Sequence, residues 1–284
     1  MNATIVNAAI HLLNTLLPML YALAALAYVV DFFRDDRLAT KATRPMLVLV
    51  ILLHAMYLAL RTLSYKHIPL ASISEVMTTT AFAVTVVYYY VEFRTGTHKT
   101  GMFLLTFSFL FQTVSSAFIS EMGVFPEVLR SPLFGVHTGS AVLGYTAFAV
   151  SAIYGVLYLL LYHDLKSNRF GIVYRHLPSL DLLSTMSRRA AVLGLVFLTI
   201  TISLGTLWGY LERVRFPHFY RDPKPISTVI VWVVYAIGAV LHYGFGWTGR
   251  RTVHFSLFGF ALLVISIMAV RLWIPSFHVG FEVK

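Results

Sequence analysis

The sequence contains no cysteine among its 284 residues. Disulfides, thiolate-bound zinc, iron–sulfur clusters and CxxC redox chemistry are therefore excluded. Charged residues are also scarce, because Asp, Glu, Lys and Arg make up 12% of the chain, against about 25% in a soluble domain. A chain with so little charge cannot cover itself with a hydrated surface, so we expect much of it to face lipid.

Apolar residues dominate what is present: 58% of the chain is hydrophobic, and the mean hydropathy is +0.76. A helix needs about 20 mostly apolar residues to cross a bilayer. Segments of this kind lie near 5–33, 45–62, 73–92, 101–118, 137–165, 189–212, 227–246 and 254–274. The first has no basic start and is too long for a cleaved signal peptide. The sequence therefore predicts an all-α, polytopic integral membrane protein of about eight transmembrane helices.

The basic residues predict the orientation of these helices, because cytoplasmic loops are enriched in Lys and Arg. Thirteen of the 22 basic residues fall in one set of alternate connections: Arg34, Arg37, Lys41, Arg44, Arg94, Lys99, Lys166, Arg169, Arg175, Arg188, Arg189, Arg250 and Arg251. We expect this side to be cytoplasmic and both termini to lie outside. Lipid headgroups account for the net charge of +10 better than nucleic acid does.

One predicted outer connection breaks this charge bias. Four basic residues crowd into it: Arg213, Arg215, Arg221 and Lys224. Either the positive-inside rule tolerates an exception here, or this loop meets an anion, and the sequence leaves both interpretations open.

Two of the eleven histidines are predicted at outer span ends. His137 opens the fifth span and His278 follows the eighth, with a basic and aromatic loop from Trp208 to Lys224 between them. Two facing imidazoles can supply both axial positions of a haem iron. Aromatic rings can stack on the macrocycle, and Arg or Lys can pair with its propionates. Loop histidines such as His67 are interpreted as solvated.

The loop and its flanks resemble a known family. The segments 204–209, 219–224, 232–236 and 246–251 are similar to the tryptophan-rich "WWD" region of the cytochrome c assembly superfamily, which includes CcsA, CcmC and HemX-type proteins. His137 with Leu143-Gly144-Tyr145 and Ser276-Phe277-His278 resemble its two outer histidine motifs. The N-terminal half, with Asp31-Phe32-Phe33 and Ser74-Glu75, resembles HemX-type members in particular, and the size and span count fit a HemX-type or stand-alone CcsA-like protein.

This resemblance implies a function and a set of residues. The protein would handle haem b at the outer face of a bacterial-type inner membrane, with a CcsB/ResB-like subunit or apocytochrome c as partner. The implied iron ligands are His137 and His278, and His242 is implied for a second haem inside the membrane. The other implied haem contacts are Trp208, Tyr220, Arg221, Asp222 and Lys224. His54, near mid-span, is an alternative partner for His242 within this chain.

Residues 1–135 are predicted to form an N-terminal four-helix unit and residues 136–284 the WWD-like unit. No nucleophile–base constellation of the hydrolytic kind is visible, so any enzymatic role would be as a component of a haem lyase. Most loop tryptophans of the family are missing, which favours as the alternative a HemX-type regulatory or structural subunit with little or no bound haem.

Overall fold

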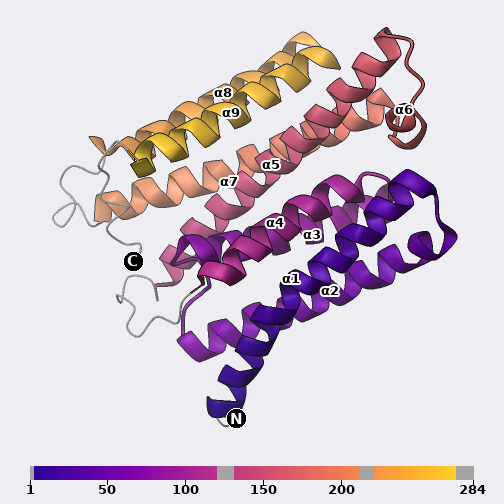
Figure 1. The fold of residues 1–284 in the computed structure, drawn as a ribbon. Helices are drawn as coiled ribbons and strands as arrows, with labels where there is room; N and C mark the ends of the chain where they lie inside the picture. Colours follow the sequence, from indigo (N-terminus) through magenta and orange to yellow (C-terminus); the bar gives the residue numbers. More distant parts are fainter. Residues whose placement is uncertain (1–2, 120–130, 212–220, 273–284) are drawn as a thin grey trace. The chain divides into compact units, whose positions relative to one another are not determined.

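The computed structural model describes residues 3–119, 131–211 and 221–272 (Figure 1). In these residues there are nine helices and no strand, and eight of the helices are long and apolar enough to cross a membrane. The helices are α1 (Ala3–Arg34), α2 (Arg37–Tyr65), α3 (Ile73–Thr95), α4 (Gly101–Phe118), α5 (Pro132–Lys166), α6 (Ile172–His176), α7 (Leu180–Leu211), α8 (Pro223–Phe245) and α9 (Arg250–Leu272). The predicted all-α polytopic fold is confirmed.

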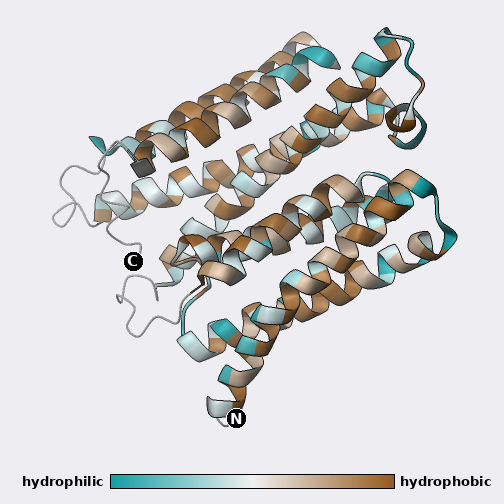
Figure 2. Cartoon of the chain, viewed as in Figure 1, coloured by the Kyte–Doolittle hydropathy of each residue, from teal (hydrophilic) through white to brown (hydrophobic). Residues whose placement is uncertain are grey.

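The helices show large apolar side chains on their outer surfaces. Figure 2 shows hydrophobic residues along the helices and hydrophilic residues gathered towards several of their ends. Leu52 is 62% exposed and Phe258 is 60% exposed. In water such surfaces would be unfavourable, whereas lipid tails are as apolar as these side chains.

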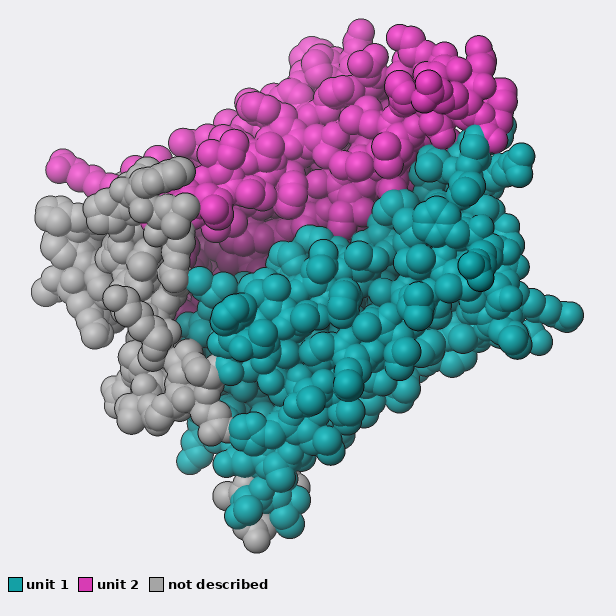
Figure 3. Space-filling view, viewed as in Figure 1, with its two compact units in different colours: residues 1–131, 171–178, 284 teal, residues 132–170, 179–283 magenta. Residues whose placement is uncertain are grey.

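The chain divides into two compact units (Figure 3). Unit 1 contains α1 to α4 together with the short helix α6, which lies in the connection between α5 and α7. Unit 2 contains α5, α7, α8 and α9.

Side-chain caps set several helix starts. Asp36 accepts hydrogen bonds from the backbone N–H groups of Leu38 and Ala39 at the start of α2. Ser72 accepts one from the N–H of Glu75 in α3. These bonds satisfy N–H groups that have no partner inside the helix.

Unit 1 has a hydrogen-bonded polar interior. The hydroxyl of Tyr21 lies 2.9 Å from Nδ1 of His54, and Nε2 of His54 lies 2.9 Å from the hydroxyl of Thr78. Thr78 in turn donates to the side-chain oxygen of Gln112 at 2.7 Å. All four side chains are fully buried, so each polar atom needs a partner, and the network ties α1, α2, α3 and α4 together.

A charged cluster lies near the start of α3 in unit 1. The carboxylate of Glu75 accepts from Arg61 at 2.9 Å, from the N–H of Ala71 at 2.9 Å and contacts Nε2 of His67 at 3.1 Å. His67 is 5% exposed. Interpreting His67 as a solvated loop histidine was therefore wrong: a carboxylate in the fold recruits it, and the local sequence around His67 does not reveal this partner.

Unit 2 is organised by close antiparallel packing of α5 against α7. Small residues meet along this seam in three pairs: Ser151 with Ser187, Gly144 with Gly194, and Ser140 with Thr201. A Cβ atom on Gly194 would lie 2.5 Å from the ring of Phe148, so only glycine allows this approach. Small residues let membrane helices come close enough for such contacts. The seam leads directly to His137.

Candidate functional site

His137 lies near the start of α5, beside the last turns of α7. Its Nδ1 lies 3.0 Å from the backbone carbonyl oxygen of Thr201. A carbonyl oxygen can only accept, so Nδ1 carries the proton and donates. Nε2 of the neutral ring is then the atom with the free lone pair. Metal-bound histidines commonly have this arrangement, in which the second nitrogen donates to a carbonyl or carboxylate.

Two residues of α7 hold the other sides of this imidazole. A Cβ atom on Gly205 would lie 2.9 Å from Cε1 of His137, so the glycine provides the space for the ring. The ring of Trp208 lies edge-on to His137 with the centroids 6.3 Å apart. Phe134 packs edge-on against the same Trp208 at 6.3 Å. The aromatic ring of Trp208 thus lies next to an oriented imidazole.

The start of α8 brings positive charge to the same end of unit 2. The half-buried Lys224, in the first turn of α8, is close enough for its charge to act on the His137 ring. Asp222 is 7% exposed and caps α8 by accepting from the N–H of Lys224 at 3.0 Å. Arg221 is exposed beside it. The structure thus brings together four of the predicted site residues: His137, Trp208, Asp222 and Lys224.

Two predicted haem contacts, His278 and Tyr220, lie outside the described residues, as do the loop residues Arg213 and Arg215. The pairing of His137 with His278 therefore stays a prediction.

His242 is separate from this group. It lies in the last turn of α8, whereas Lys224 lies in the first. At about 1.5 Å per residue the two are about 27 Å apart along the axis. Nδ1 of His242 donates to the carbonyl of Trp247 at 2.5 Å. His242 belongs to the opposite end of unit 2 from His137.

His54 has no nitrogen left for a metal. Both ring nitrogens are engaged, one with Tyr21 and the other with Thr78. The structure therefore favours a structural role for His54 over the alternative of a haem ligand.

Sequence reasoning missed the residues that orient His137. Thr201 acts through its backbone carbonyl, and any residue type can supply that group. Gly205 offered a signal, because it lies four residues after Thr201 and thus on the same face of α7. The buried cluster of Arg61, His67 and Glu75 was also missed.

These observations define the class of protein. It is a polytopic helical membrane protein with an oriented imidazole and aromatic side chains at one end of a four-helix unit. The sequence profile of the Cytochrome C assembly protein family matches residues 12–278. The chain belongs to this family.

Three relatives illustrate the similarity. Protein HemX of Brevibacillus brevis is 26% identical over 88% of this chain and 91% of its own length. Cytochrome c biogenesis protein CcsA of Heterosigma akashiwo is 22% identical over 78% of this chain and 79% of its own length. Inner membrane protein YpjD of Escherichia coli K12 is 22% identical over 61% of this chain and 64% of its own length. The chain is thus a multi-pass inner membrane protein related to cytochrome c biogenesis.

Proposed function

We propose that the protein binds one haem at the His137 end of unit 2 and holds it for delivery to a partner in cytochrome c biogenesis. The observation that carries this proposal is the hydrogen bond from Nδ1 of His137 to the Thr201 carbonyl, because it leaves Nε2 as the coordinating atom. His137 and His278 are the proposed axial ligands. Membership of the cytochrome c assembly family supports the same assignment.

The residues around His137 suit a haem in their chemistry. Trp208 offers an aromatic surface beside the imidazole, and Tyr220 is proposed to pack on the ring with it. Lys224 and Arg221 are proposed to pair with the propionates, whose negative charge they would neutralise. Asp222 contributes by capping α8, which fixes the backbone of Lys224. When bound, haem would be the iron porphyrin that the protein passes to a partner.

The partner is proposed to be apocytochrome c or a CcsB/ResB-like subunit. A second haem at His242 would need its other ligand from such a subunit, because His54 is occupied in unit 1. The protein would then act as a component of a haem lyase.

One observation favours a second candidate function. The chain has only four tryptophans, and the predicted loop retains few of the family's tryptophans. A HemX-type regulatory or structural subunit, with little or no stably bound haem, would not need them.

Absorption spectroscopy separates the two functions. The full chain is purified in mild detergent from cells supplied with haem precursor, and haem is quantified as the pyridine haemochrome. The haem-handling function predicts a Soret band and close to one haem per chain. A correctly folded protein that carries no haem and takes up none when haem is added would support the regulatory subunit instead.

A further inference from the structure

A groove lined by α7, α8 and α9 lies at the end of unit 2 that contains His242. Residues spaced three, four or seven apart on each helix line it, among them Arg188, Val192 and Leu195 on α7 and Tyr235, Ala239 and His242 on α8. The two helices run antiparallel, so Arg188 lies opposite His242 and Leu195 opposite Tyr235. Two helical turns give the groove a length of about 10 Å.

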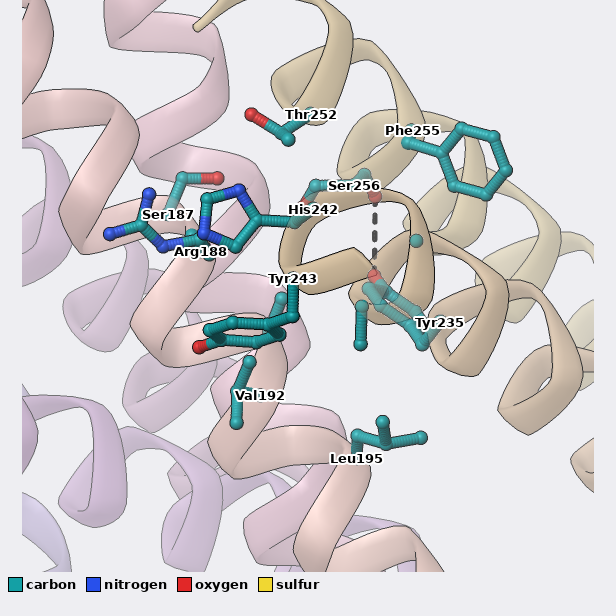
Figure 4. Close-up of a pocket in the computed structure, with 13 residues that line it drawn as sticks. Ser187, Arg188, Val192, Leu195, Tyr235, His242, Tyr243, Thr252, Phe255 and Ser256 are labelled. Atoms are coloured by element: carbon teal, nitrogen blue, oxygen red, sulfur yellow. Dashed lines mark hydrogen bonds between the residues drawn. The ribbon is translucent and has the colours of Figure 1, made fainter. Parts of the chain in front are cut away.

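The groove is polar at one end and apolar at the other. Figure 4 shows the guanidinium of Arg188 and the ring of His242 directed towards the same space, with Val192 and Leu195 farther along. Ala239 and Gly238 leave room between the helices. Tyr235 turns its hydroxyl away to the carbonyl of Ser256, at 3.2 Å. This distribution matches a molecule with a charged head and an apolar tail.

Arg188 lacks an acidic partner in the part of the chain that the structure describes. It is half-buried, and no carboxylate is among the residues that line the groove. An ionised side chain at the edge of a membrane is costly unless it meets a counter-charge or water. Its position inside a groove, rather than on an outer face as for Arg189, points to an anion from outside the chain.

His242 adds a second requirement for the ligand. Its Nδ1 donates to the Trp247 carbonyl, so Nε2 of the neutral ring carries a lone pair and accepts. No hydrogen bond to Nε2 comes from the described residues. The head of the ligand therefore needs an anionic group for Arg188 and a hydroxyl donor for His242.

We propose that this groove binds an anionic phospholipid with a hydroxyl-bearing headgroup, such as phosphatidylglycerol. The phosphate pairs with Arg188, a headgroup hydroxyl donates to Nε2 of His242, and an acyl chain lies along Val192, Leu195 and Ala239. The surroundings agree, because Arg250, Arg251 and Trp247 lie at the same end of unit 2, as residues do at a lipid headgroup layer. A haem held by His242 would need its second axial ligand from a partner subunit, because His242 is the one histidine among the groove residues. The lipid is proposed for the chain without that subunit.

The test compares two neighbouring arginines. The full chain in neutral detergent is titrated with short-chain phosphatidylglycerol, and thermal unfolding is followed. We expect a saturable rise in melting temperature for the wild type and for Arg189→Gln. Arg188→Gln should need at least tenfold more lipid for half of that rise. Phosphatidylcholine with the same chains should give little rise in any of the three proteins.

Two further variants test the tail and the hydroxyl. Ala239→Leu fills the groove and should weaken binding, whereas Val240→Leu changes a 58% exposed side chain on the outward face and should not. His242→Ala should reduce the preference for phosphatidylglycerol over phosphatidic acid, which has no headgroup hydroxyl. Native mass spectrometry counts the lipid retained by each variant.

Other outcomes would overturn the proposal. An equal response of Arg188→Gln and Arg189→Gln would mean that the lipid binds elsewhere. An equal rise with glycerol phosphate would assign the groove to a free phosphate ester. Stoichiometric haem uptake that is lost in His242→Ala, unaffected by phosphatidylglycerol, would assign it to haem.

Discussion

Nδ1 of His137 donates a hydrogen bond of 3.0 Å to the carbonyl oxygen of Thr201, which joins the start of α5 to the end of α7. The bond fixes both the tautomer and the orientation of the imidazole. Its geometry depends on the small-residue seam between the two helices, so unit 2 positions the candidate ligand through packing rather than through a flexible loop.

Gly205→Ala should disturb this imidazole. The added Cβ would lie 2.9 Å from Cε1 of His137, so the ring or the helix must move. Loss of ligand orientation typically costs about 10–100-fold in metal affinity. We expect haem retention to fall by that order in a haem titration. Thr206→Ala is the control, because Thr206 is the next residue and is exposed. This variant should bind haem as the wild type does.

The positive charge around the start of α8 should strengthen haem binding. Charge-assisted hydrogen bonds contribute about 1.5–3 kcal/mol each. Changing Arg221 and Lys224 together to Gln should therefore weaken haem retention by tens-fold or more. The paired control, Arg250→Gln with Arg251→Gln, removes equal charge at the other end of unit 2. Unchanged haem affinity in a correctly inserted Arg221/Lys224 variant would reduce these two residues to surface charge.

Removal of the buried carboxylate in unit 1 should destabilise the protein. Glu75→Ala leaves Arg61 without its partner, and breaking a buried ion pair costs about 3–5 kcal/mol. Denaturant unfolding in mixed micelles measures the loss. The double change Arg61→Met with Glu75→Leu removes both charges and should recover most of the stability. Equal stability of Glu75→Ala and the wild type would show that the cluster is solvated.

The connection that contains α6 should loosen in acid. Hydrogen bonds from Lys99 and His176 hold the pKa of Asp35 below its ordinary value of 3.8. A carboxyl with a lowered folded pKa stabilises above that ordinary value, and the contribution is lost as the pH falls through the folded pKa. Asp35→Asn should imitate this at neutral pH, with faster hydrogen exchange at residues 172–176. Asp36→Asn is the control: it keeps the helix cap, and hydrogen exchange at residues 172–176 should stay as in the wild type.

The predicted orientation can be tested with reporter fusions. A periplasmic-type phosphatase fused after Lys284 should be active, because both termini are predicted outside. The same enzyme inserted in the 166–188 connection should be inactive. The reverse pattern would overturn the sidedness assigned to His137 and to the basic end of unit 2.

Hydropathy alone predicted all eight long helices, because a lipid-facing helix needs a long apolar stretch. It placed their ends less well: α7 begins at Leu180 rather than at 189, and α8 begins at Pro223 rather than at 227. Polar first turns and the cap at Asp222 extend the helices beyond their apolar stretches. The short helix α6 has no apolar signal and was missed.

The candidate site was only partly predictable. His137, Trp208 and Lys224 carry recognisable chemistry, so the sequence could single them out. The Thr201 carbonyl and the clearance at Gly205 depend on which helices pack together, and one sequence does not encode that in its local pattern. The resemblance implied a haem inside the membrane for His242, and the structure describes this residue in the last turn of α8, about 27 Å along the helix axis from Lys224.

The most direct test of the account is the absorption spectrum of single-histidine variants. With His137 and His278 both bound to iron, the wild type should be low-spin, and His137→Ala and His278→Ala should each lose or shift the spectrum. Added imidazole should restore part of it, while His242→Ala should leave it largely unchanged. If both outer variants keep the wild-type low-spin spectrum, the ligand assignment is contradicted.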